Sequence, residues 1–162
     1  MKARILWLDE DKSFVLVSHR QRLEIDGYDV DRAYSLSDCL YYLGEGNYDL
    51  FILDVIVPVS EHEEQRFPRE KTQNGKLSGL VFYEMFQNVF EEKHTEVMVY
   101  TIRDDKEVRE AFVKAGLEPE LYVIKQEVAD TAEFVEKVRK ILKAKRNGYG
   151  EKPDQGGGRV RG

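Results

Sequence analysis

Polar side chains that could do chemistry follow short apolar runs at four places in the chain. The run ILWL is followed by an acidic triplet, LFIL by an aspartate, VMVY by a threonine and LYVI by a lysine. If these runs are parallel strands, their carboxyl ends meet at one edge of a sheet, where open α/β folds form their sites. The residues concerned are Asp9, Glu10, Asp11, Asp54, Thr101 and Lys125.

Carboxylates brought together in this way would repel one another unless a cation lay between them. Oxygen ligands suit Mg²⁺, which accepts a few carboxylates and keeps several of its waters. Beside such a cation, with Thr101 and Lys125 ready to hold an anion, Asp54 could attack phosphorus and carry an aspartyl phosphate. The pattern therefore predicts phosphoryl chemistry at Asp54, and an Mg²⁺ site with it.

Each of these residues also has a simpler interpretation. Asp9, Glu10 and Asp11 could be acids at the start of the first helix, where the helix dipole favours negative charge. Asp54 could be a turn residue at the end of a strand, and Thr101 could be a helix cap. The expected convergence of Asp54 with Lys125 favours the chemical interpretation.

The elements that must position these side chains alternate along the chain. Almost wholly apolar runs are typical of strands buried on both faces of a parallel sheet. Between them lie helical patterns, some with a capping residue or a glycine stop. The order predicts an α/β fold with helices on both faces of a parallel sheet. The expected strands are 4–8, 28–33, 50–53, 97–100 and 121–124, and the expected helices are 14–25, 36–43, 79–93, 104–115 and 131–145.

Two segments do not fit this alternation. Residues 59–78 hold eight charges, a proline and Asn-Gly with no periodicity, which predicts a long loop leaving the rim of the site. Two interpretations stay open for this loop, a lid or docking element and an inert surface insertion. Residues 146–162 are basic and rich in glycine, which predicts a disordered tail.

Composition narrows the class of protein. The 162 residues are 41% hydrophobic and 35% charged with a formal net charge of −6, which fits one packed domain and argues against a nucleic-acid binder. No stretch is long enough for a signal peptide or a membrane span, so we expect a cytoplasmic protein. The single cysteine, Cys39, is expected to be a packing residue, and His19, His62 and His94 are expected at the surface.

Several motifs in order resemble the receiver domains of two-component response regulators, over about residues 3–145. ILWLDEDKS is similar to the first strand with its acidic pair, and YDLFILDVIVP is similar to the strand that carries the phosphoacceptor, with Pro58 four residues on. SGLVFYEMF resembles the helix led by a glycine, here Gly79. VMVYT resembles the strand ending in the switch hydroxyl, and LYVIK ends in the family lysine, with Tyr122 at the switch aromatic position.

This resemblance implies a flavodoxin-like (βα)5 fold with strand order 2-1-3-4-5, spanning a receiver domain over 1–145. It implies phosphorylation of Asp54 by a histidine kinase or phosphotransfer protein, with Thr101 and Lys125 assisting. The implied Mg²⁺ ligands are Asp9, Glu10, Asp54 and Ile56.

Output is implied through contact with a downstream protein, because the chain holds no further predicted domain, no membrane insertion and no expected nucleic-acid surface. We expect a monomer or weak homodimer. Apart from its own phosphorylation and dephosphorylation, we expect no enzymatic activity.

The resemblance also implies a conformational switch. Phosphoryl charge at Asp54 would pull Thr101 inward, and Tyr122 would follow into the vacated space.

The chain departs from the family pattern at three site positions. Glu10 stands where the family has an aspartate, Ile102 where it has a small residue, and Gln126 where it has proline, so a cis peptide is not expected there. Ile56 and Arg103 occupy the positions that usually contact the hydrolytic water. Neither can activate that water, and Arg103 is expected to pair with the phosphoryl oxygens, so we expect slow dephosphorylation.

Two alternatives follow from these departures and from the site itself. One is a degenerate receiver that binds partners without being phosphorylated. The other is an Mg²⁺-dependent phosphatase or another α/β enzyme, against which counts the lack of a second acid–base group near Asp54 in the sequence.

Overall fold

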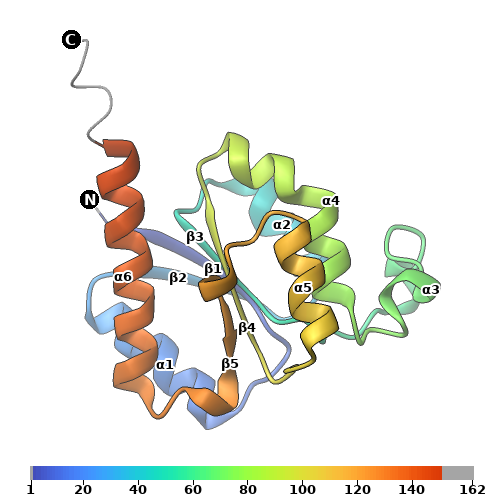
Figure 1. Cartoon of the computed structure of the whole chain (residues 1–162), viewed down its shortest axis with the longest axis horizontal. Helices are drawn as coiled ribbons and strands as arrows, with labels where there is room; N and C mark the ends of the chain where they lie inside the picture. The colour runs from blue at the N-terminus through green and yellow to red at the C-terminus, as the bar shows by residue number, and fades with distance from the viewer. Residues whose placement is uncertain (1, 151–162) are drawn as a thin grey trace.

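The chain folds into a parallel sheet flanked by helices on both faces (Figure 1). The structure is a computed structural model, and it describes residues 2–150. The strands are β1 (Arg4–Leu8), β2 (Asp29–Ala33), β3 (Leu50–Leu53), β4 (Glu96–Thr101) and β5 (Tyr122–Ile124). The α-helices are α1 (Phe14–Ile25), α2 (Leu36–Glu45), α3 (Arg69–Thr72), α4 (Ser78–Glu92), α5 (Lys106–Lys114) and α6 (Thr131–Gly150). Single 3₁₀ turns lie at η1 (Glu61–Glu63), η2 (Pro119–Leu121) and η3 (Lys125–Glu127).

All neighbouring strands are parallel, in the order β2-β1-β3-β4-β5. This is the predicted α/β architecture, with the five predicted strands confirmed and their ends shifted by one residue at β2, β4 and β5. Because all strands run the same way, the residues that follow β1, β3, β4 and β5 lie at one edge of the sheet, as the sequence predicts.

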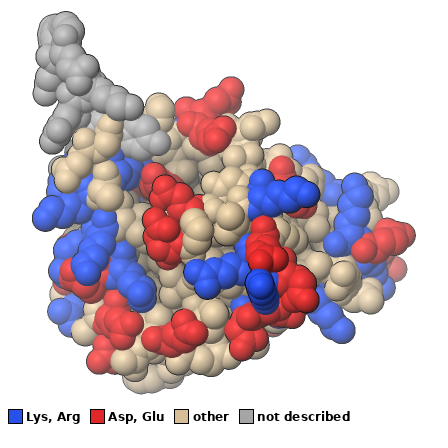
Figure 2. Space-filling view, viewed as in Figure 1, with Lys and Arg blue, Asp and Glu red and all other residues tan. Residues whose placement is uncertain are grey.

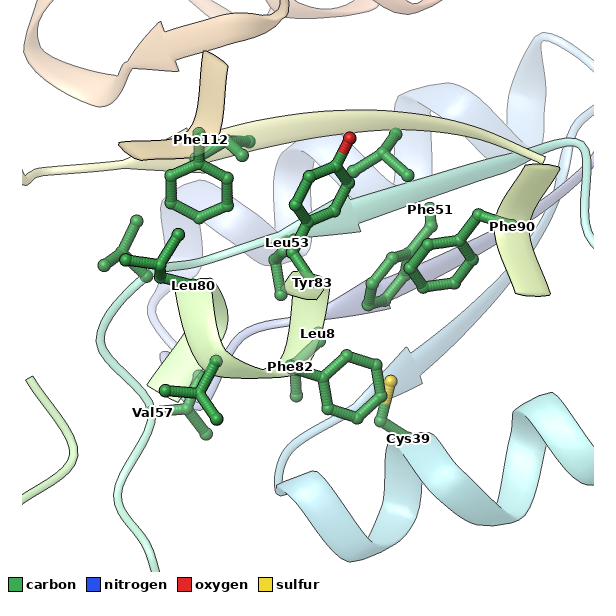
Figure 3. Close-up of a cluster of buried hydrophobic side chains, with 14 of the residues drawn as sticks. Leu8, Cys39, Phe51, Leu53, Val57, Leu80, Phe82, Tyr83, Phe90 and Phe112 are labelled. Atoms are coloured by element: carbon green, nitrogen blue, oxygen red, sulfur yellow. The ribbon is translucent and has the colours of Figure 1, made fainter. Parts of the chain in front are cut away.

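Each face of the sheet has its own apolar layer. Leu16 of α1 and Phe134 of α6 pack with Trp7 of β1 on one face. The other face carries the larger cluster, in which side chains of α2, α4 and α5 surround those of β1 and β3 (Figure 3). Cys39 is fully buried in this cluster, as predicted for a packing residue. The labelled members of the cluster are Leu8, Cys39, Phe51, Leu53, Val57, Leu80, Phe82, Tyr83, Phe90 and Phe112.

His19 is buried, which contradicts its predicted surface position. Its ring stacks on Phe134 at 4.5 Å, with Nδ1 2.8 Å from the Thr131 hydroxyl and Nε2 3.3 Å from the Tyr100 hydroxyl. Burial, and then the charge of Lys125, lower its pKa. The ring behaves as a neutral aromatic with both nitrogens satisfied, which a polar position on a helix does not reveal in the sequence.

The last helix continues to Gly150, five residues past its predicted end. Glycine and charge in this stretch predict a tail, but the first residues of the predicted tail extend the helix. The remainder of that tail, 151–162, lies outside the described residues.

The segment 59–78 is more regular than the predicted loop. It contains the η1 turn and the short α3 helix, and it projects beside α4 at one end of the molecule (Figure 1). Phe67 is 1% exposed and stacks on Phe82 of α4 at 5.9 Å, so the segment has its own anchor in the core. We call residues 59–77 the insertion.

Glu63 holds the insertion to the start of α2. Its carboxylate accepts hydrogen bonds from the Ser37 amide at 2.8 Å, the Ser37 hydroxyl at 2.6 Å and the Ser60 amide at 2.9 Å. Burial works to raise the pKa of Glu63, but the hydrogen bonds from Ser37 and Ser60 outweigh it and lower that pKa. A carboxylate at a helix N-terminus is also favoured by the helix dipole.

Replacing Glu63 with glutamine is therefore expected to lower the free energy of unfolding by about 2 kcal/mol at pH 7, since three hydrogen bonds lose their charge. Glu61→Gln, in the same turn and exposed, is the matched control and is expected to change nothing. A lowered pKa stabilises the fold above the ordinary value of 4.5, and this is lost as the pH falls through the native pKa. Urea unfolding should show that the stability difference between Glu63→Gln and the unmodified chain is smaller at pH 3 than at pH 7. Equal stability of Glu63→Gln and Glu61→Gln at pH 7 would contradict the stabilising role of the Glu63 carboxylate.

Candidate functional site

Two buried carboxylates and one ammonium group meet at the carboxyl edge of the sheet. Asp9 follows β1 and Asp54 follows β3, and their amides continue the ladder to Ala33 and Leu8 at 3.0 Å each. Lys125, directly after β5, donates from Nζ to Asp9 Oδ2 at 2.8 Å and to Asp54 Oδ2 at 3.4 Å. The predicted convergence of these three residues is confirmed.

The charges at this point are not balanced. Asp9 is fully buried and Asp54 is 6% exposed, and the two carboxylates share one ion-pair partner, the ammonium group of Lys125. Burial, and next the charge of Asp54, raise the pKa of Asp9 to about 6 even though Lys125 works to lower it. For Lys125, burial opposes the charge, but the charges of Asp54 and Asp9 outweigh it and raise its pKa. The pair of carboxylates would be stabilised by a second positive charge.

Thr101 lies at the end of β4, the strand between those that precede Asp54 and Lys125. It is fully buried, and its hydroxyl oxygen accepts a hydrogen bond from the Arg103 amide at 3.2 Å. Its strand-end position matches the prediction. Within residues 2–150 the hydroxyl donates no hydrogen bond, so its hydrogen is available to an anion.

The predicted metal ligands are only partly gathered. Asp9 and Asp54 lie together, whereas Glu10 is exposed, and among residues 2–150 no group of three or more His, Cys, Asp or Glu side chains is arranged to hold a metal ion. Ile56 is half-buried, and its backbone amide donates to Asp54 Oδ1 at 3.4 Å. Because its side chain has no ligand atom, Ile56 could bind a cation only through its main-chain carbonyl oxygen. The paired buried carboxylates, with the raised pKa of Asp9, are the part of this set that fits Mg²⁺.

Asp11 has a structural role. Its carboxylate accepts hydrogen bonds from the amide and the hydroxyl of Ser13, the residue before α1, at 2.8 and 3.2 Å. The acidic triplet thus divides, with Asp9 in the site and Asp11 at the start of the helix. The simpler interpretation, acids at a helix start, applies to Asp11 alone.

Arg32 is a positioning residue that the sequence analysis does not identify. Arg32 lies inside β2 and not after the end of a strand, where the predicted site residues lie. It is 5% exposed, and its Nη2 donates to the carbonyl oxygens of Asp9 and Asp11, both at 2.9 Å. Its guanidinium lies over the rings of Trp7 and Tyr34 at 4.9 and 4.8 Å. The sequence carries little signal for this role, because Arg32 lies in the strand DVDRA, in which three of the five residues are charged.

Gly79 is required where α4 begins, because the helix backbone rests on the residue that follows β3. The Gly79 amide donates to the Val55 carbonyl at 2.9 Å. A Cβ at Gly79 would lie 2.1 Å from the Asp54 carbonyl oxygen and 2.8 Å from Val55 Cα. Only glycine allows α4 to approach Asp54 this closely.

Arg103 does not face the site as expected. Its guanidinium pairs with the Asp105 carboxylate at 2.7 and 2.9 Å and donates to the Lys76 carbonyl at 3.0 Å. In this structure the adjacent carboxylate holds the side chain, and the pairing of Arg103 with phosphoryl oxygens stays a prediction. Arg103 instead ties the end of the insertion to the turn after β4.

Tyr122 is already turned into the protein. The residue is 4% exposed, its ring lies 5.6 Å from Phe112, and its hydroxyl donates to the Arg103 carbonyl at 2.7 Å. Burial is the main reason that its pKa is raised to about 12. Tyr122 therefore occupies an inward position in this structure, and its movement on phosphorylation stays a prediction.

The remaining departures lie at the rim. Ile102 is 53% exposed, and Gln126 donates from Nε2 to the Ile102 carbonyl at 3.4 Å. Every peptide bond between residues 2 and 150 is trans, including the one before Gln126, as predicted. None of the helices in residues 2–150 is long and apolar enough to cross a membrane.

No family model and no curated protein matches the sequence, but solved structures match the fold. A CheY-like receiver domain protein from Methanospirillum hungatei JF-1 is 19% identical with a TM-score of 0.69, covering 91% of this chain and 99% of its own. A response regulator from Thermotoga maritima is 22% identical with a TM-score of 0.63, covering 88% and 99%. A Francisella response-regulator receiver domain is 19% identical with a TM-score of 0.63, covering 88% and 98%.

These identities bear on the fold alone. The strand order β2-β1-β3-β4-β5, the helices on both faces and the near-complete coverage of the matched domains agree with one another. The chain has the fold of the response-regulator receiver domains.

Proposed function

We propose that this chain is a receiver that accepts a phosphoryl group on Asp54 in an Mg²⁺-dependent reaction and signals by contact with another protein. The single observation that carries the proposal is the Lys125 ammonium shared between Asp9 and Asp54, with the buried Thr101 hydroxyl on the intervening strand. The donor is a histidine kinase or phosphotransfer protein. The setting is the cytoplasm, with the chain acting as a monomer or weak homodimer.

The chain's own residues account for the transfer. An Asp54 carboxylate oxygen attacks phosphorus, the bond from phosphorus to the donor's imidazole nitrogen breaks, and that nitrogen keeps the electron pair. Lys125 holds one phosphoryl oxygen by its charge, and the Thr101 hydroxyl donates to another. Mg²⁺ bound by Asp9 and Asp54, with Glu10 and the Ile56 carbonyl as further ligands, would neutralise charge on the phosphoryl oxygens.

The test is mass spectrometry of the full chain after incubation with acetyl phosphate and Mg²⁺. We expect the gain of one labile phosphoryl group, lost in Asp54→Asn and retained in Asp11→Asn, whose carboxylate bonds to Ser13. Chelation of Mg²⁺ is expected to abolish the gain. An equal gain in Asp54→Asn would place the phosphoryl group elsewhere.

A second candidate is a degenerate receiver that binds its partner without phosphorylation. The buried position of Tyr122, with its hydroxyl already bonded to the Arg103 carbonyl, favours it, as does the exposure of Glu10. No phosphoryl gain with acetyl phosphate or a kinase, together with intact folding, would support this candidate. Turnover of a phosphomonoester would instead support the phosphatase.

Replacing Ile56 with asparagine is expected to shorten the phosphoryl lifetime several-fold. The half-buried Ile56 side chain cannot orient a water, and the Arg103 guanidinium is occupied by Asp105, so the unmodified chain is expected to keep its phosphoryl group for many minutes to hours. Phosphate loss after removal of the donor measures this, with Ile56→Val as the control that keeps an apolar side chain. Loss within seconds in the unmodified chain contradicts the prediction.

A further inference from the structure

A cavity of about 310 Å³ opens at the other edge of the sheet, beside the amino end of β4. Its walls come from α4, the turn that follows α4, the start of β4 and the turn that follows α5. Glu96 begins β4 and Thr101 ends it, so the length of the strand separates this cavity from the Asp54 site. The polar residues of the wall, with Gly116 among them, are Tyr83, Gln87, Glu91, His94, Thr95, Glu96 and Glu118.

The Tyr83 hydroxyl is the most informative group in the wall. Tyr83 is 4% exposed, and its ring lies 5.6 Å from Phe112 and 6.4 Å from Phe90. Within residues 2–150 its hydroxyl makes no hydrogen bond, and this oxygen is not one of the fully buried polar atoms, so a ligand can reach it from the cavity. This hydroxyl lies 3.6 Å from the place that a Cβ would take on Gly116, so it faces the cavity.

Gly116 keeps this space open. Its φ is +120°, which side chains rarely adopt, and a Cβ there would lie 2.5 Å from Gln87 Nε2. The Gln87 amide in turn donates to the Glu91 carboxylate at 3.3 Å. The absence of a side chain at Gly116 leaves the Tyr83 hydroxyl accessible from the cavity.

The cavity is negatively charged. Burial, and then the charge of Glu118, raise the pKa of Glu96, while burial and the charges of Glu91 and Glu96 raise the pKa of Tyr83. The carboxylates are therefore close enough to repel one another and to act on the same hydroxyl. Acidic side chains also gather on the visible surface between α6 and α5 (Figure 2).

Three lysine and arginine side chains, Lys140, Lys145 and Arg109, lie nearby but outside the cavity wall. Lys145 of α6 lies in the neighbouring groove, where it lowers the pKa of Glu96 and donates to Asp49 at 3.3 Å. Arg109 of α5 donates to the Pro119 carbonyl at 3.0 Å. None of the three lines the cavity beside Tyr83, where the basic side chain of the wall is that of His94.

We propose that this cavity binds an organic cation, an alkylguanidinium or alkylammonium group, with Glu96 and Glu118 pairing with its charge and the Tyr83 hydroxyl accepting a hydrogen bond. Apolar walls from Phe90, Val97, Leu117 and Leu121 suit the hydrocarbon stem of such a group. The cation is either a free small molecule or the end of an arginine or lysine side chain of another protein. This site is independent of phosphorylation at Asp54.

Isothermal titration of the full chain tests the site with three probes. Butylguanidine carries the cation, butylurea is its neutral analogue of the same shape, and a Gly-Arg-Gly peptide with blocked ends presents the same group on a backbone. We expect saturable binding of butylguanidine and binding of butylurea at least about tenfold weaker, because the urea has no charge to pair with the carboxylates. Binding of the peptide as well identifies a protein side chain as the source; its failure beside bound butylguanidine identifies a free molecule.

Single substitutions locate the binding. Tyr83→Phe and Glu118→Gln are each expected to weaken butylguanidine binding about tenfold, through the loss of one bond to a charged ligand. Glu120→Gln is the matched control, since Glu120 is exposed two residues away and lines only the neighbouring groove. Glu118 is exposed, so its variant keeps the test valid if Tyr83→Phe fails to fold. No saturable binding of either cation, equal binding of butylurea, or equal loss in Glu120→Gln overturns the proposal.

Discussion

Replacing Lys125 with methionine is expected to lower the free energy of unfolding by about 3 kcal/mol at pH 7 and to abolish phosphoryl acceptance. The variant leaves Asp9 fully buried and Asp54 nearly so, with no cation between them. Breaking a buried pair by removing one partner is strongly destabilising, because it leaves charge uncompensated. The loss of phosphoryl acceptance has a second cause, since no ammonium then holds the phosphoryl oxygen.

The pH dependence of this variant identifies the cause of its instability. A carboxyl whose native pKa is raised, as that of Asp9 is from 3.8 to about 6, destabilises the fold as the pH rises from the unfolded to the native value. Without Lys125 this effect grows, so the deficit of the variant should shrink between pH 7 and pH 5, where Asp9 takes up a proton.

Urea unfolding of both proteins at the two pH values provides the measurement. Lys143→Met, an exposed lysine of α6, serves as the control and is expected to stay within about 0.5 kcal/mol of the unmodified chain. A Lys125 variant as stable as this control would show that the shared ammonium carries little of the site's stability.

Replacing Gly79 with alanine is expected to cost at least about 3 kcal/mol of unfolding free energy. The new Cβ would stand 2.1 Å from the Asp54 carbonyl oxygen, and this contact is with backbone rather than with a side chain that could move aside. Either α4 shifts outward or the turn after β3 is displaced, and both move Asp54 away from Lys125. Phosphoryl acceptance should therefore fall together with stability.

Gly44→Ala provides the matched control for this substitution. Gly44 lies inside α2, and a Cβ there meets nothing within 4 Å. Alanine is favoured over glycine in a helix by about 1 kcal/mol, so this variant should be slightly more stable than the unmodified chain. Destabilisation of the same size in both variants would show that the contact with Asp54 is not the cause.

The sequence predicts those parts of the fold and site that depend on strands. The apolar runs place Asp9, Asp54, Thr101 and Lys125 at strand ends, and a parallel sheet then brings those ends together. The hydrophobic periodicity and the strand order are sufficient to predict that these four residues converge, because neither depends on the orientation of an individual side chain.

The features that the sequence does not reveal depend on pairings between distant side chains. Arg103 turns to Asp105 and to the Lys76 carbonyl, and Glu63 of the insertion binds the start of α2. Arg32 stacks on Trp7, and His19 finds Thr131 and Tyr100. In each case a polar residue is more buried than its type predicts, because a specific partner compensates for lost hydration.

The two outer strands bear on how the chain behaves at high concentration. The inner strands β1, β3 and β4 are almost wholly buried, and such sequences join other chains readily when their backbone groups are exposed. On one side the sheet ends in β2, which carries Asp29 and Asp31. On the other side it ends in β5, a strand of three residues between the turns η2 and η3. Charge at one edge and brevity at the other protect the folded protein from edge-to-edge aggregation.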